Sequence, residues 1–337
     1  MKEKAVMGFI GVLTALLITI TMADVLGNAG KGQLPVEDNG QSSSNVLDND
    51  NNIPPNSNPD KDNENNENPN DKGDENNPDN NTDKPDSIID VAGTTLITRV
   101  LAPKGYNRVS AENGSFAQFL RDYQLKENGA KVLLYDGKEK SNQASAMAVF
   151  ALPLEAKDLQ QCADSIMRVY AEYYLSIKQY DKICFGYSDG FKAEYAKWIE
   201  GNRISVSNSG TKWVKKAEKD ESYESFQEYM RMVFAYAGIW TMKDESSSIS
   251  LGEAQIGDVF FDTKDGGRVA MIVDMCQGED GRTAYLLASG GKPAQEFELL
   301  VNPLHPDDPW YYEEEIVAQV DTPEFTYKSD SLRRLKY

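Results

Sequence analysis

The chain has 337 residues, a formal net charge of −19 at pH 7 and 3 cysteines. Residues 31–86 carry 14 Asp and Glu against 4 Lys, so −10 of that charge belongs to one segment and only −9 to the rest. Because phosphate binding requires a basic face, this balance excludes nucleic acid as an expected partner, and three cysteines are too few for a disulfide framework in a body this large.

An uncharged run covers residues 5–23, with Lys2 and Lys4 before it and Asp24 after it. It fits either a cleaved signal peptide, with an apolar core of about 7–15 residues, or an uncleaved anchor of about 17–25 residues. We favour the anchor because the run exceeds a signal-peptide core. The preceding lysines then predict an extracytoplasmic protein that residues 1–27 tether to the membrane, or a secreted one if the segment is cleaved.

Residues 28–87 consist mostly of Asn, Asp, Glu and Pro, with few apolar side chains. Such a segment cannot bury enough surface to offset the entropy of ordering it. We therefore predict a disordered acidic linker that acts as a spacer. Its scattered aspartates match no calcium-binding loop, and we expect neither a metal nor a cofactor in the protein.

Apolar residues return at Ile88 and continue to Tyr337, which predicts one domain over residues 88–337. Apolar spacing predicts a helix over 157–178 with Asp158 as its cap, a second over 222–238 that ends at Gly238, and a short one over 115–122 with Ser115 as its cap. Strands are expected at 131–135, 182–187, 257–262, 268–275, 283–288 and 295–301. Helices followed by an antiparallel meander indicate an α+β fold.

Cys162 lies in the first turn of the long predicted helix. Unpaired N–H groups and the helix dipole at that position stabilise a thiolate and lower the thiol pKa. Gln160 and Gln161 precede it and offer amide donors near an oxyanion. The alternative interpretation is that Cys162 is an ordinary small core residue on the apolar stripe of the helix.

The stretch GDVFFDTKDGGRVAMIVDM, residues 257–275, is typical of a hairpin. Together with the cysteine-led helix, it resembles the second half of the NlpC/P60 cell-wall peptidases, which are papain-like. In that family the second strand begins with the catalytic histidine. Arg268 stands at this place in the present chain.

A wider pattern resembles the uncharacterised bacterial family DUF4846. Its most specific parts are DLQQCAD at 158–164 and the series PAQ, NP and PWY between 293 and 311. The resemblance covers about residues 99–335 and implies an exported protein of unassigned function with a papain- or NlpC/P60-like core. This chain departs from the family pattern at Gly267-Arg268, where Gly-His is expected, and at Ser289-Gly290-Gly291.

The replacement of histidine by arginine has a chemical consequence. Arginine stays protonated at any working pH, so Arg268 cannot be the general base that takes the Cys162 proton. The only histidine in the chain is His305, in a Pro-flanked loop that we interpret as surface. Amide hydrolysis therefore requires His305 or a carboxylate as a substitute base.

The sequence leaves three functional hypotheses. The favoured one is a catalytically impaired cysteine-hydrolase-like module that binds a cell-envelope peptide or glycan. The others are an active cysteine hydrolase or transferase with a substituted base, and a purely structural envelope interaction module. Further candidate binding residues, each of which also has an ordinary structural interpretation, are Asp164, Asp258, Ser289, Gln295 and Trp310.

Overall fold

The structure, a computed structural model, describes residues 87–337, apart from the side chain of Asp265. The predicted anchor or signal segment, 1–27, and all but the last residue of the predicted linker, 28–87, lie outside the described residues. Within 87–337, no helix combines the length and the apolar character that crossing a membrane would take.

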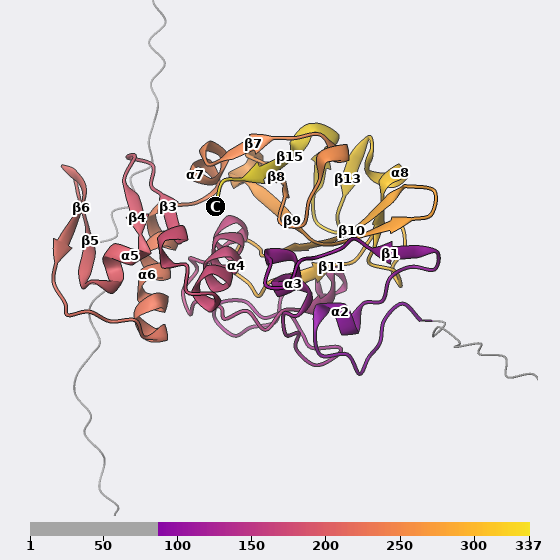
Figure 1. Ribbon diagram of the computed structural model, residues 1–337, viewed down its shortest axis with the longest axis horizontal. Helices are drawn as coiled ribbons and strands as arrows, with labels where there is room; N and C mark the ends of the chain where they lie inside the picture. The colour runs from indigo at the N-terminus through magenta and orange to yellow at the C-terminus, as the bar shows by residue number, and fades with distance from the viewer. Residues whose placement is uncertain (1–86) are drawn as a thin grey trace, which may run out of the picture. The chain divides into compact units, whose positions relative to one another are not determined.

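A nine-stranded sheet, antiparallel at every pairing, forms the centre of the described region (Figure 1). Its main path runs β2-β11-β10-β9-β8-β15-β7, while β1 pairs with β9 and β12 pairs with β10. The strands are β1 (Tyr106–Arg108), β2 (Ala146–Val149), β7 (Ser246–Ser248), β8 (Val259–Asp262), β9 (Arg268–Gly278), β10 (Thr283–Ser289), β11 (Glu298–Leu300), β12 (Tyr311–Tyr312) and β15 (Leu332–Leu335).

Three two-stranded ribbons and seven α-helices complete the described part of the chain. The ribbons pair β3 (Cys184–Gly186) with β4 (Lys192–Glu194), β5 (Asn202–Ser207) with β6 (Gly210–Lys215), and β13 (Gln319–Asp321) with β14 (Thr326–Lys328). The helices are α2 (Leu96–Arg99), α3 (Phe116–Arg121), α4 (Cys162–Ser176), α5 (Tyr195–Ile199), α6 (Tyr223–Tyr236), α7 (Ile239–Asp244) and α8 (Glu313–Ile316). These elements establish the α+β class with a mainly antiparallel sheet.

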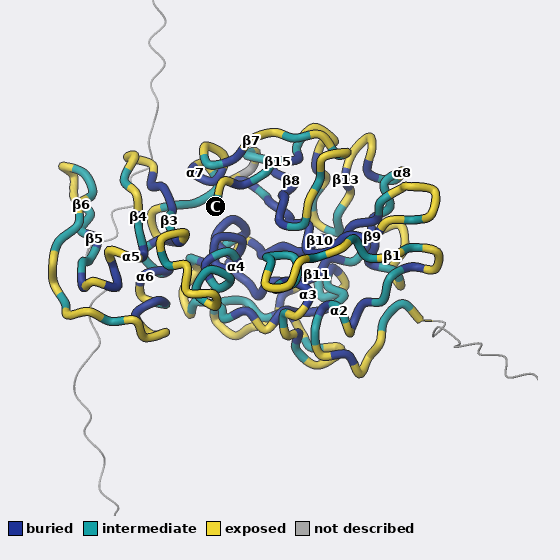
Figure 2. Tube along the Cα trace, in the orientation of Figure 1, coloured by how far each residue is buried: buried dark blue, intermediate teal, exposed yellow. Residues whose placement is uncertain are grey.

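Both faces of the sheet are covered, as the dark tube of β9 and β10 shows in Figure 2. Along β9, Val269, Met271 and Val273 belong to the core that includes α4, whereas Ala270 and Ile272 belong to a second core on the other face. This alternation follows from the two-residue period of a strand. A strand buried on both faces is apolar throughout, which explains the unbroken run VAMIV.

The strand predictions are confirmed in large part. The predicted strands at 257–262, 268–275 and 283–288 correspond to β8, β9 and β10, and 295–301 contains β11. The stretch 182–187 contains β3, but this strand pairs with β4 outside the main sheet. The prediction of a strand at 131–135 is wrong, because Leu133 and Leu134 form only isolated bridges.

The long helix begins later than its apolar spacing predicts. α4 starts at Cys162, and Gln161 is its N-cap. Asp158 does not cap the helix, because its carboxylate accepts hydrogen bonds from the Ala294 N–H and the Gln161 side-chain amide. The other two caps behave as predicted, since Ser115 caps α3 and the α6 helix ends before Gly238.

Candidate functional site

A hollow of about 220 Å³ lies at the N-terminus of α4. α4 packs against β9 and β10 on one side and against α6 and α7 on the other, which brings residues distant in sequence to this end of the helix. The lining comes from four segments: residues 158, 159 and 161–164 before and within α4, residue 234 in α6 with residues 237–239 after it, Gly266 and Gly267 before β9, and Lys292.

Cys162 lines this hollow from the first position of α4. Its side chain is buried, with 4% of the residue exposed. Burial raises the pKa of the thiol to about 11, although the charges of Arg268 and Lys292 act to lower it. The prediction of a thiol pKa lowered by the helix N-terminus is therefore wrong, because desolvation of the thiolate outweighs the favourable charges. Cys162 is a neutral thiol at pH 7.

Arg268 is the first residue of β9 and lies opposite Asp262 of β8. It is partly buried and donates a hydrogen bond of 2.8 Å to the Gly267 carbonyl. Gly267 has a φ of +85°, and a Cβ atom there would lie 2.5 Å from the Ile239 side chain. The glycine therefore lets the loop before β9 approach α7 closely, which places Arg268 within electrostatic range of Cys162.

The two glutamines before Cys162 have different roles. Gln160 is buried, and its amide donates to the Pro153 carbonyl while its oxygen accepts from the Glu155 N–H. It anchors the loop before α4 and does not line the hollow. Gln161 lines the hollow, and its amide donates to Asp158. Only Gln161 remains a candidate for contact with a ligand.

Asp164 lies in the first turn of α4 and lines the same hollow. One carboxyl oxygen, Oδ2, accepts a hydrogen bond of 3.2 Å from the Gln161 N–H. The other, Oδ1, is buried and has no partner among the described residues. Burial raises the pKa of this carboxyl well above its ordinary value, against the lowering effect of backbone N–H groups.

Lys292 lines the hollow without having been anticipated from the sequence. It follows Gly290 and Gly291, and a Cβ atom at Gly290 would lie 2.5 Å from Ser165 Oγ on α4. This close approach brings the segment after β10 against the first turns of the helix. The departure of residues 289–291 from the family pattern marks the segment, but no sequence signal indicates where the lysine lies.

Three further candidates do not line the hollow. Ser289 is buried and its hydroxyl donates to the Val269 carbonyl. Gln295 is buried and donates to Glu298, whereas Trp310 is 0% exposed and donates to the Leu101 carbonyl. These contacts are those of structural residues.

Asp258 does not line the hollow either. It forms an ion pair with Arg334 at 2.8 Å and accepts a hydrogen bond from the Gln255 N–H.

His305 lies at the other end of β10 from the hollow. It pairs with Glu315 at 2.5 Å and packs edge-on against Tyr312, which is opposite Ala284 near the start of β10. Ser289, beside Val269 and Arg268, is at the far end of that strand. Seven residues of strand span roughly 20 Å. The structure therefore does not bring His305 to Cys162.

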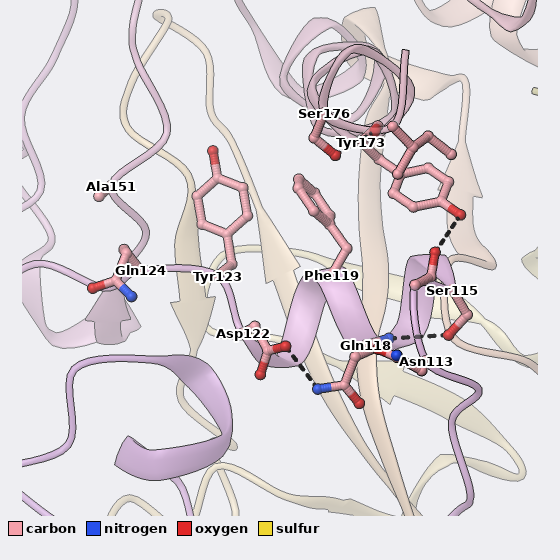
Figure 3. Close-up of a pocket in the computed structure, with 12 residues that line it drawn as sticks. Asn113, Ser115, Gln118, Phe119, Asp122, Tyr123, Gln124, Ala151, Tyr173 and Ser176 are labelled. Atoms are coloured by element: carbon pink, nitrogen blue, oxygen red, sulfur yellow. Dashed lines mark hydrogen bonds between the residues drawn. The ribbon is translucent and has the colours of Figure 1, made fainter. Parts of the chain in front are cut away.

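A second, larger hollow of about 500 Å³ lies between α3, the last turn of α4 and Ala151 (Figure 3). The rings of Phe119, Tyr123 and Tyr173 stand side by side along it, with centroid separations of 5.3 and 5.4 Å from Phe119 to its two neighbours. Gln118 donates to Asp122 at its edge, 2.7 Å away. This second hollow combines apolar rings with amide and carboxylate groups.

Comparison with known proteins identifies the family and nothing more specific. Neither the proteins with curated descriptions nor the solved structures contain a match to the chain. The model of one family, described as "Domain of unknown function (4846)", matches residues 96–334, which include α4, the hairpin of β8 and β9, and both hollows. The chain therefore belongs to the DUF4846 family.

Proposed function

We propose that this protein is a membrane-tethered, extracytoplasmic binding module with a papain- or NlpC/P60-like domain whose hydrolase chemistry is impaired. Its ligand is a cell-envelope peptide or glycan. The likeness to papain-type hydrolases is supported by the position of Cys162. It is the first residue of α4, and α4 packs against β9, the strand that begins with Arg268. A thiol hydrolase whose base has been replaced would carry such a pairing.

The surroundings of Cys162 carry this proposal, because its thiol is buried and the neighbouring charged group is Arg268. A thiol with a pKa of about 11 needs a base to become a nucleophile at neutral pH. The nearby Arg268 is permanently charged and accepts no proton. His305, the single histidine of the chain, is paired with Glu315 at the far end of β10. The hollow is therefore better suited to hold a ligand than to cleave one.

The test uses the purified full-length chain with peptidoglycan fragments. We expect it to sediment with intact peptidoglycan, and we expect mass spectrometry to find the fragments unchanged after incubation. The Cys162→Ala variant should bind equally well. Cleavage by the natural chain that disappears in Cys162→Ala would refute the proposal. Absence of any binding would favour a purely structural module instead.

An active hydrolase with a substituted base is the second candidate, and Asp164 is the residue that favours it. This carboxyl lines the same hollow and has one unpartnered oxygen. Iodoacetamide alkylation separates the two functions. A neutral thiol reacts slowly at pH 7, and its rate rises about tenfold per pH unit toward the thiol pKa. A rate that is fast and flat into the acidic range would instead reveal a stabilised thiolate.

The glycan part of the proposal is supported by the second hollow. The accessible parts of these partly buried rings can contact the C–H face of a sugar, while the amide and carboxylate groups at the edge bind its hydroxyls. We expect Phe119→Ala to weaken sedimentation with glycan strands that carry no peptide, whereas Cys162→Ala should not. Equal binding by both variants would remove this hollow from the proposal.

A further inference from the structure

We propose that the hollow at the N-terminus of α4 recognises the terminal carboxylate of a short peptide. The inference rests on the proposed binding function and deepens it by naming the chemical group that is bound. Four features carry it: Lys292 in the lining with the charge of Arg268 nearby, the N–H groups of the helix, a buried carboxyl group with one oxygen unpartnered among the described residues, and small apolar walls.

Lys292 lines the hollow, and Arg268, which is not part of the lining, contributes its charge through its proximity to Cys162. Neither has a carboxylate within 4 Å among the side chains that the structure describes, whereas Arg121, Arg334 and Arg282 each do. Lys292 extends over the hollow, since a Cβ atom on Gly266 would lie 2.7 Å from its Nζ atom. In a protein as acidic as this one, Lys292 at the opening, with the charge of Arg268 close to Cys162, is available for an anionic ligand.

The helix supplies directed donors to the same place. α4 has 15 residues, so its dipole places partial positive charge at Cys162 and Ala163. The Gln161 N–H donates to Asp164 and to the Leu159 carbonyl, and the Asp164 N–H belongs to a capping box with the Gln161 side chain, which leaves the N–H groups of Cys162 and Ala163 without an acceptor in the helix. A carboxylate at this end would accept hydrogen bonds from N–H groups that are otherwise unpaired.

Asp164 provides an independent indication of a ligand. Only 7% of the residue is exposed, it lines the hollow, and Oδ1 makes no hydrogen bond among the described residues. A buried polar atom without a partner is costly, so a native protein normally satisfies it. In the protonated form that burial favours, this carboxyl group donates an O–H to an anion instead of repelling it.

The walls favour a peptide end over a phosphate. Phe234, Ala237 and Ile239 give an apolar surface, and about 220 Å³ accommodates one small residue with its carboxylate. Asp158 also lines the hollow, and its negative charge opposes a dianion more strongly than a singly charged group. Lys292 and Arg268 together with the negative charge of Asp158 leave one positive charge in surplus, which matches a singly charged group.

Calorimetry at pH 7 tests the inference with three probes: acetyl-alanyl-alanine, its C-terminal amide and inorganic phosphate. We expect the acid to bind at least tenfold more tightly than the amide, and phosphate to bind more weakly than the acid. Lys292→Met should weaken binding of the acid at least fivefold, and Arg268→Gln by a smaller factor. Lys264→Met removes the same charge from the turn before β9, outside the lining, and should change binding less than twofold.

Equal binding of acid and amide, tighter binding of phosphate, or an unchanged affinity in Lys292→Met would each overturn the inference. The variants are compared only after their thermal unfolding shows that they fold. If intact peptidoglycan is bound while the acid and its amide bind equally, only the carboxylate inference fails. Hydrolysis of an envelope peptide that requires Cys162 would overturn the proposed function itself.

Discussion

At the scale of single residues, burial decides the chemistry of the groups around α4. Cys162 and Asp164 lie in the first turn of a helix, where the dipole favours negative charge on both. Both are nevertheless buried, and desolvation is the largest influence on each pKa. The result is a neutral thiol beside a carboxyl group that retains its proton above its usual range.

Asp164 gives a testable dependence of stability on pH. Its pKa is raised in the folded state, so the folded protein binds more protons than the unfolded chain above about pH 4. The free energy of unfolding should therefore fall as pH rises from that value to the folded pKa, by up to about 1.4 kcal/mol per unit. Asp164→Asn keeps an oxygen for the Gln161 N–H and should remove this fall.

Urea unfolding of both proteins between pH 4 and pH 8 measures the difference. We expect the Asn variant to be the more stable one at pH 7. Parallel profiles for the two proteins would show that Asp164 ionises normally in the folded state.

Asp274 makes a different contribution, since it is a buried charge with partners. It is 0% exposed and pairs with Arg121 at 2.8 Å and Arg108 at 2.5 Å, which fixes α3 and β1 to β9. Asp274→Ala should reduce the free energy of unfolding by about 3–5 kcal/mol, because two guanidinium groups lose their counter-charge in the interior. Chemical denaturation measures the change.

Asp280→Ala is the matched control for this substitution. It removes a carboxylate from an exposed pair with Arg282, which lies at 2.6 Å. Exposed pairs contribute less than about 1 kcal/mol. A similar cost for the two substitutions would contradict the structural role assigned to Asp274.

At the scale of elements, the site depends on how closely the segment after β10 approaches α4. Gly290 makes this contact, since a Cβ atom there would lie 2.5 Å from Ser165 Oγ and 3.0 Å from Ser165 Cβ. Gly290→Ala should therefore destabilise the fold by about 1–3 kcal/mol through overpacking. It should also weaken ligand binding, because Lys292 is two residues away.

Gly252→Ala is the control, because a Cβ atom at that position meets nothing within 4 Å. Thermal unfolding compares the two variants. An unchanged midpoint in Gly290→Ala would mean that the segment moves away from α4 without cost.

At the scale of the described domain, the sheet is completed by the end of the chain. β15 lies between β8 and β7, and Arg334 next to its end pairs with Asp258. Tyr337 packs edge-on against Tyr170 and Phe185.

Deletion of residues 332–337 removes these contacts and leaves the edge of β8 unpaired. We expect loss of cooperative unfolding by circular dichroism and aggregation on purification. A truncated chain that unfolds cooperatively would contradict this role.

Much of the fold is predictable from local pattern. α6 and the strands β8, β9 and β10 have strong periodicity and clear turn residues, so local sequence determines them. β2, β7 and β15 are short and contribute to the sheet through partners far away in the chain. Local pattern does not indicate such pairings. The start of α4 is also misjudged, because tertiary contacts of Asp158 and Gln160 replace helical hydrogen bonds.

The sequence by itself determined the α+β class, the family resemblance, the position of Cys162 in the first turn of the long helix and the absence of histidine at residue 268. These properties depend on residue type and local periodicity. Only the tertiary structure decided that Cys162 is buried and neutral, that His305 lies at the far end of β10, and that Lys292 joins the hollow. Burial and proximity arise from contacts between distant segments, and no local pattern specifies them.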